Sequence, residues 1–112
     1  MSTERKTLIL AVSRDKDAAA MFAPLAGLFN SIILTRYIDN PRGRDALDLY
    51  ELVRPQTLVG QDGTVVTISD DPAAAWQQAL AENHGTHAIC IAGSAFLVAE
   101  MRPLVVDWAS DR

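Results

Sequence analysis

The sequence predicts an α/β fold, a three-layer Rossmann-like sandwich in which a mostly parallel sheet has helices on both faces. Two observations predict it. Short apolar runs alternate with helix-like segments, as in repeated βαβ units. The first run, at residues 8–12, is apolar at every position, which is typical of a central strand covered on both faces. At 112 residues the chain has the size of one domain, so we expect residues 1–112 to form a single domain.

Four strands are expected from the apolar and β-branched runs of the sequence. They lie at residues 7–13, 31–37, 64–68 and 87–92. The third follows the stretch of the chain that is richest in turn-forming residues, so it could also form a short hairpin with residues 57–59.

Four helices are expected between and after these strands. They lie at residues 17–28, 44–53, 72–83 and 94–102, where apolar side chains recur every three or four positions. In the first of them, Asp15 or Asp17 can cap the amino end.

Prolines set or interrupt several of these helices. Asp71 followed by Pro72 is a favoured order for a helix start, since aspartate caps and proline suits the first turn. We expect Pro24 to kink the first helix, and Pro55 and Pro103 to end the second and fourth.

Composition excludes several classes of function. The net charge of −4 and the lack of a basic run argue against a nucleic-acid partner. No apolar stretch approaches the ~20 residues that span a bilayer, and the polar amino terminus does not resemble a signal peptide. The single cysteine, Cys90, cannot form an internal disulfide and lies in an apolar run, so we expect a buried, inert thiol and a cytoplasmic location.

Three polar loops begin where predicted strands end. They lie at residues 13–17, 39–42 and 93–94. In an open α/β sheet, ligands bind outside the carboxyl ends of the strands. The loops therefore bring Lys16, Arg42 and Ser94 to one edge of the sheet, where a lysine, an arginine and a serine suit an anionic ligand.

Each loop also has a purely structural interpretation. Lys16 precedes a helix start that favours anions, but the aspartates there could simply cap that helix. Arg42 can grip a carboxylate with two parallel hydrogen bonds, although Asn40 and Pro41 also suit a turn before a helix. Asp39 could hold the Arg42 guanidinium or bind an ammonium group. Ser94 could cap a helix or touch a ligand.

Other candidate sites have less support. His84 and His87 lie on either side of a helix stop, so helical spacing for a metal is lost and no metal site is expected. No Ser-His-Asp set or pair of carboxylates with a plausible catalytic spacing is present. The chain also has no Gly-rich phosphate loop. It therefore resembles one half of an active site.

Taken in order, these loops resemble the carboxy-terminal domain of the Mur ligase superfamily, and most closely its folylpolyglutamate synthase and dihydrofolate synthase branch. The features that carry the resemblance cover nearly the whole chain: Asp15-Lys16-Asp17, Asp39-Asn40-Pro41-Arg42, the alanine-rich segment 73–81 and the stretch 91–100. The second of these motifs is also similar to the substrate-carboxylate motif of peptidoglycan tripeptide ligases.

The resemblance implies an ATP-dependent amide ligase. In that family ATP phosphorylates a substrate carboxylate, and the amino group of an incoming amino acid, glutamate in the folate branch, attacks the acyl phosphate. By resemblance, Lys16 and Arg42 would neutralise the carboxylates of that amino acid. Ser94 would hydrogen-bond one of them, Asn40 would position it, and Asp15 and Asp39 would support the site.

The family's phosphate loop, magnesium ligands and folate-binding surface belong to a central ATPase domain that this chain lacks. We therefore expect no cofactor in this chain, ATP and Mg with the missing domain, and no ligase activity from the 112 residues alone. Two other interpretations stay open. One is a stand-alone Rossmann-like module that binds a small anion or a nucleotide without catalysis. The other is a receiver-like signalling domain, but no lysine follows residue 16 to complete its site.

Overall fold

The alternation of strands and helices is confirmed by a computed structural model of the chain. The residues described are 6–14, 16–25, 28–37, 45–57, 65–69, 71–83, 88–92 and 102–105. The elements are, in order, β1 (Lys6–Leu10), α1 (Ala18–Phe22), β2 (Ser31–Leu34), α2 (Ala46–Thr57), β3 (Val65–Ile68), α3 (Pro72–Asn83) and β4 (Ala88–Ala92). Residues 102–105 add a helical turn. Within these ranges no helix has the length and apolarity needed to cross a membrane.

The four strands form one parallel sheet in the order β3-β2-β1-β4. The chain therefore builds outward from β1 through β2 to β3 and then crosses to the other side of β1 to form β4. In the register of the sheet, Leu10 pairs with both Leu34 and Ala92. These three residues end their strands, so β1, β2 and β4 finish side by side.

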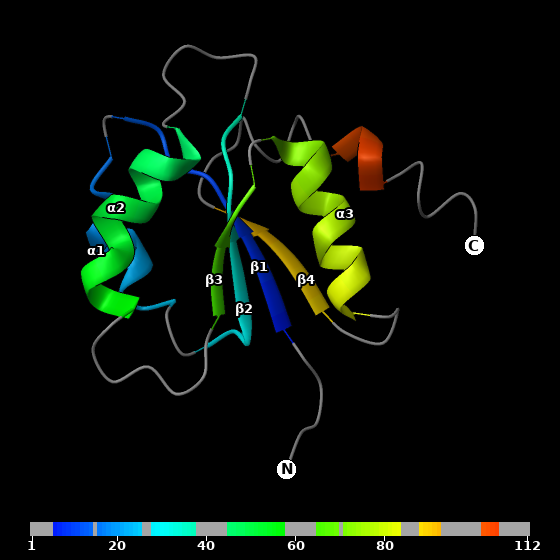
Figure 1. Cartoon of the computed structure of the whole chain (residues 1–112), viewed down its shortest axis with the longest axis horizontal. Helices are drawn as coiled ribbons and strands as arrows, with labels where there is room; N and C mark the ends of the chain where they lie inside the picture. The colour runs from blue at the N-terminus through cyan, green and yellow to red at the C-terminus, as the bar shows by residue number, and fades with distance from the viewer. Residues whose placement is uncertain are drawn as a thin grey trace.

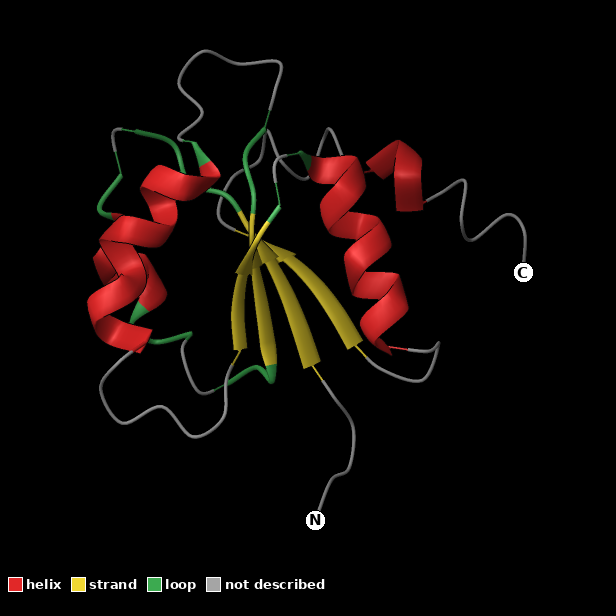
Figure 2. Cartoon of the chain, viewed as in Figure 1, coloured by secondary structure: helices red, strands yellow, loops and turns green. Residues whose placement is uncertain are grey.

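Helices cover both faces of this sheet, and the predicted fold class is confirmed. Helices α1 and α2 lie on one face and α3 lies on the other (Figures 1 and 2). The helical turn at residues 102–105 lies beside α3, and Leu104 and Val105 pack against the core on that side.

Alternating side chains of β1 enter two separate clusters of the core. Leu8 and Leu10 point toward α1 and α2, where they pack with Phe22 and Leu49. Ile9 points the other way, into the cluster beneath α3. All three β1 side chains are at most 1% exposed. Because both faces of β1 are covered, an apolar residue is favoured at every position, which explains the run seen in the sequence.

Helix α1 is shorter than the residues 17–28 expected for it. Asp17 caps its start, since the Asp17 carboxylate accepts a hydrogen bond of 3.1 Å from the backbone N–H of Ala20. The helix ends at Phe22 with Ala23 as its carboxyl cap. Pro24 follows directly and has no N–H to donate to a helical carbonyl, so it ends the helix rather than kinking it.

Helix α2 extends beyond the end expected for it. The prediction that Arg54 and Pro55 stop this helix is wrong, because it continues to Thr57. Proline removes one backbone donor from the last turn. Among the side chains described for this helix, those of Ala46, Leu49 and Val53 are buried, and all three precede the proline. Packing through these residues therefore holds the helix regardless of that lost bond.

Helix α3 begins and ends as predicted. The Asp71 carboxylate accepts a hydrogen bond of 2.8 Å from the N–H of Ala74, in front of Pro72. On its inner face Ala75, Trp76 and Ala79 are buried, so the tryptophan is part of the core.

The expected hairpin is corrected in part, and the end expected for the fourth helix is not tested. The hairpin proposed for residues 57–59 is wrong at Thr57, which belongs to α2, while 58 and 59 lie outside the described residues. Most of the fourth expected helix, residues 94–101, lies outside the described residues, so its end at Pro103 stays a prediction, and Pro103 itself lies inside the helical turn 102–105. Its ring fixes φ near the helical value, so a helical position suits it where no N–H is needed.

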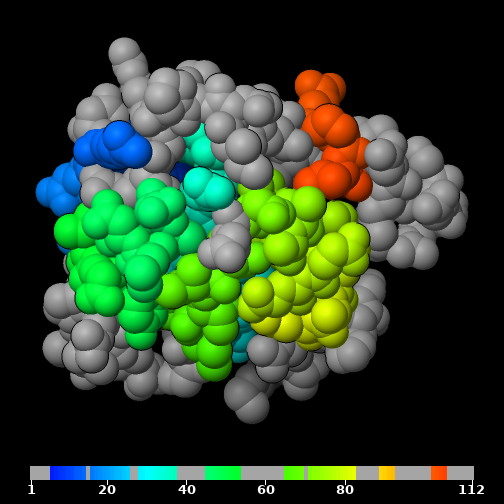
Figure 3. Space-filling view, turned by 45° about the horizontal axis from the view of Figure 1, so that its top comes forward, coloured from blue at the N-terminus to red at the C-terminus, as the bar shows by residue number. Residues whose placement is uncertain are grey.

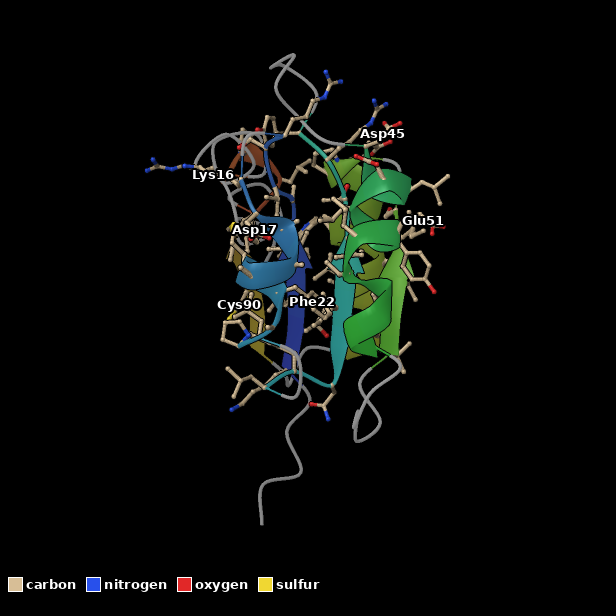
Figure 4. The ribbon with its side chains drawn as sticks, turned by 90° about the vertical axis from the view of Figure 1, so that its left-hand side faces the viewer. Lys16, Asp17, Phe22, Asp45, Glu51 and Cys90 are labelled. Atoms are coloured by element: carbon tan, nitrogen blue, oxygen red, sulfur yellow. The ribbon has the colours of Figure 1, made fainter. Side chains whose placement is uncertain are left out.

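Cys90 is exposed, and the expectation of a buried thiol is wrong. Its partner in the register is Leu8, whose side chain lies on the face covered by α1 and α2. Among the described elements, β4 contacts β1 and α3 but neither α1 nor α2. The face of β4 that carries Cys90 therefore has no helix of the described part over it, and Figure 4 shows Cys90 near this outer side.

The two faces of α2 predict very different effects for the same substitution. Leu49 is fully buried, whereas Leu47 on the same helix is 60% exposed. We expect Leu49→Ala to lower the free energy of unfolding by about 2–5 kcal/mol through the lost burial and the cavity left behind. Leu47→Ala should change it by less than about 0.5 kcal/mol. Urea denaturation followed by circular dichroism measures both, and equal effects of the two substitutions would contradict this packing of α2.

Candidate functional site

The carboxyl ends of the parallel strands form the edge where the sequence predicted a binding site. Since β1 is flanked by β2 on one side and β4 on the other, the order of the strands reverses beside β1. Ligands of open α/β sheets bind at such a switch point. The loops after β1, β2 and β4 leave this edge from neighbouring positions, because Leu10, Leu34 and Ala92 are paired.

The loop after β1 is a tight turn that leads into α1. The N–H of Lys16 donates a hydrogen bond of 3.2 Å to the carbonyl of Ser13. The side chains of Arg14, Lys16 and Asp17 are exposed. The turn therefore presents two cations to solvent at the carboxyl edge, next to the first turn of the helix.

The start of α1 already has an anion of its own. The Asp17 carboxylate accepts the Ala20 N–H, and the helix has five residues. The alternative that an aspartate caps this helix is thus confirmed for Asp17. The Lys16 ammonium, and not the helix terminus, is the group here that suits a bound carboxylate.

The loop after β2 is joined across its base by an ion pair. A guanidinium nitrogen of Arg36 lies 3.7 Å from a carboxylate oxygen of Asp45, just before α2. Thr35 and Tyr37, on either side of Arg36, are buried. Figure 4 shows Asp45 at the same end of the molecule as Lys16 and Asp17, so these charged groups share the carboxyl edge.

Of the residues predicted for the site, the structure describes Lys16. The others lie outside the described residues: Asp15, Asp39, Asn40, Arg42 and Ser94. The structure brings together the ends of β1, β2 and β4, from which the loops that carry these residues start. The roles of all six side chains therefore stay predictions.

Two features of this edge were not foreseen from the sequence. The Arg36–Asp45 pair joins residues nine positions apart, and no motif marks it. The Thr35 hydroxyl, fully buried directly after β2, has no hydrogen-bond partner among the described residues. The sequence shows only that a threonine follows an apolar strand. This does not predict whether its hydroxyl has a hydrogen-bond partner.

The described part of the edge offers cations and carboxylates rather than a metal centre. No group of three His, Cys, Asp or Glu side chains within the described ranges could hold a metal ion. Such an edge suits the binding of a small charged molecule.

Two solved structures share this fold over almost the whole chain. FolC of E. coli, in complex with DHPP and ADP, superposes with a TM-score of 0.76 and 21% identity over 97% of this chain. A bifunctional folylpolyglutamate synthase/dihydrofolate synthase from Yersinia pestis, complexed with AMPPNP and Mn ion, superposes with a TM-score of 0.71 and 24% identity over 91% of this chain. This chain has the fold of one part of these enzymes. No protein-family model and no curated protein matches it.

The matched segments are a minor part of the two enzymes. The chain covers 24% of the E. coli protein and 22% of the Yersinia protein. The resemblance in fold to the folylpolyglutamate synthase branch, expected from the three loop motifs, is confirmed at the level of structure. Activity and substrates belong to those longer proteins.

The buried Thr35 hydroxyl, which has no hydrogen-bond partner among the described residues, predicts an unusual result for a core substitution. Thr35→Val keeps the shape of the side chain and removes this polar group, so we expect the free energy of unfolding to rise by about 1 kcal/mol. Thr67→Val is the matched control. The Thr67 hydroxyl accepts a hydrogen bond of 2.7 Å from the side-chain amide of Gln78, so its loss should destabilise by about 1 kcal/mol.

Urea denaturation of the three proteins compares the two hydroxyls directly. A Thr35→Val variant destabilised as much as Thr67→Val would show that the Thr35 hydroxyl does have a partner in solution.

Proposed function

We propose that this chain is the carboxy-terminal, substrate-binding domain of an ATP-dependent amide ligase of the folylpolyglutamate synthase type, and that residues 1–112 form that single domain. The observation that carries the proposal is the shared fold with FolC over 97% of the chain. The alignment of three strand ends at one edge, each followed by a motif of that enzyme branch, supports it.

The proposed role is to hold the incoming glutamate for attack on an acyl phosphate. Lys16 and Arg42 neutralise the two carboxylates of glutamate, Ser94 donates a hydrogen bond to one of them, and Asn40 orients the molecule. Asp15 and Asp39 support these groups. The exposure of Lys16 at the carboxyl edge is consistent with this role. Catalysis by such a domain comes from proximity and from matched charge, with no proton transfer by its own side chains.

The remaining chemistry belongs to partners of this domain. A central ATPase domain binds ATP, Mg and the substrate that carries the acceptor carboxylate, so the 112-residue chain alone turns over no substrate. The nucleotides and the Mn ion named with the two structural neighbours support the use of ATP and a divalent metal by the whole enzyme. The exposed thiol of Cys90 is compatible with the reducing cytoplasm, where we place the protein.

A binding module without catalysis is the alternative. Arg14 and Lys16, both exposed at the carboxyl edge, would also suit a small anion or a nucleotide. Binding of glutamate alone does not separate the two functions, but turnover with an ATPase domain does.

The decisive experiment replaces the matching quarter of E. coli FolC with residues 1–112 of this chain. We expect the chimera to incorporate labelled glutamate in the presence of ATP, Mg and a pteroate or folate acceptor. Lys16→Ala and Arg42→Ala should each raise the KM for glutamate about 10-fold or more, since each removes a charge-assisted contact.

Lys6→Ala is the matched control. Lys6 is an exposed lysine at the amino end of β1, whereas Lys16 follows the carboxyl end of the same strand. This substitution should leave the KM for glutamate unchanged. A chimera that folds and binds ADP but incorporates no glutamate would refute the ligase function and favour the binding module.

A further inference from the structure

We propose that the face of β4 that carries Cys90 and Ala92 is an interface onto which a helix from another part of the ligase packs. We call it the open face of β4. The inference rests on the proposed function, because that function makes this chain one part of a longer enzyme. Nothing in the candidate site at the carboxyl edge uses this face.

The two sides of β4 are covered unequally. Ile89 and Ile91 pack into the core cluster on the side of α3, and α3 contacts β4. On the other side Ala92 is only partly buried and Cys90 is exposed. Neither α1 nor α2 contacts β4. Since parallel strands are covered on both faces in α/β proteins, β4 lacks half of its cover within the described residues.

The connections between the described strands cannot supply the missing helix. The crossovers from β1 to β2 and from β2 to β3 step away from β4, and they place α1 and α2 on one face of the sheet (Figure 1). The crossover from β3 to β4 steps back across the sheet, so a right-handed connection puts α3 on the opposite face. The helical turn at residues 102–105 also packs on the side of α3. A helix over the open face must therefore come from elsewhere.

The composition of β4 is that of a strand with neighbours on every side. It pairs with β1, and no described strand pairs with its other edge. Exposed edge strands commonly carry a charged residue or a proline that prevents unwanted pairing, but the sequence of β4, AICIA, contains neither. The small side chains of Cys90 and Ala92 also leave room for a helix to approach closely. The isoleucines of β4 fill the corresponding space beneath α3.

The occupant follows from the length of the enzymes that share this fold. The chain covers 24% of FolC, so most of such an enzyme lies outside the matched segment. Helices are the elements that cover the faces of parallel sheets. A helix of that remainder would continue the layer of α1 and α2, which contact each other. Its side chains over Cys90 should be apolar, because β4 offers no charged partner and an unpaired buried charge is costly.

The test uses Cys90 as a reporter in the chimera of E. coli FolC and residues 1–112. We expect N-ethylmaleimide to alkylate Cys90 about 10-fold or more slowly in the chimera than in the isolated chain, because a packed helix excludes the reagent. Mass spectrometry of the peptide that contains Cys90 measures both rates.

Glu51→Cys, made in both proteins, is the matched control. It places a thiol on the exposed surface of α2, the helix that covers the same face of the sheet (Figure 4). The alkylation rate of this thiol should differ by less than about two-fold between the two proteins, since its exposure is the same in both.

Each outcome decides the inference. Equal rates for Cys90 in the two proteins overturn it. Alkylation of the isolated chain that slows as its concentration rises shows that a second copy covers the face, which overturns it as well. If the chimera is misfolded and binds no ADP, residues 1–112 are mixed with FolC that lacks the matching quarter, and slower alkylation of Cys90 is again required. A protected Cys90 in a chimera that incorporates no glutamate upholds the interface and refutes the ligase function. Glutamate incorporation with an unprotected Cys90 has the opposite meaning.

Discussion

The pairing of β1 with β2 on one side and β4 on the other is the constraint on which the rest of the structure depends. A parallel strand can pair in this way only if both faces of the sheet are covered, since its crossovers place helices there. The described helices α1 and α2 cover one face and α3 covers the other. Side chains of β1 contribute to both clusters of the core. The same pairing fixes the register, so the ends of three strands lie abreast. The candidate site is thus a direct consequence of how the core is built.

The strands were predictable because their burial leaves a simple pattern in the sequence. The four described strands lie where apolar or β-branched runs predicted them, and their ends are shifted by a few residues at most. Helix ends were less predictable, because they depend on packing that the local sequence does not report. Pro24 ends α1, whose buried face ends at Phe22, whereas Pro55 leaves α2 intact because the buried residues before it already hold that helix. The same residue type has opposite outcomes in the two helices.

Cys90 shows the limit of reading burial from composition. An apolar run predicts a strand that is buried on both faces. Whether a strand is buried also depends on which helices pack against it. On the face that carries Cys90, the described helix α2 contacts β2 and β3, and neither α1 nor α2 contacts β4. Similarly, the Arg36–Asp45 pair depends on the position of α2 above the end of β2, which only the fold determines. The sequence located the loops of the candidate site, while pairwise contacts within it required three-dimensional structure.

The capping of α1 changes how the edge can bind an anion. A free helix terminus attracts an anion through its unpaired N–H groups. Here the Asp17 carboxylate takes the Ala20 N–H, so a ligand at this point would meet an existing negative charge. Lys16 is exposed next to the helix, and Asp45 pairs with Arg36 next to α2. Groups of both signs are therefore present along the described part of the edge. The glutamate of the proposed function carries an ammonium and two carboxylates, so groups of both signs at this edge are favourable for that proposal.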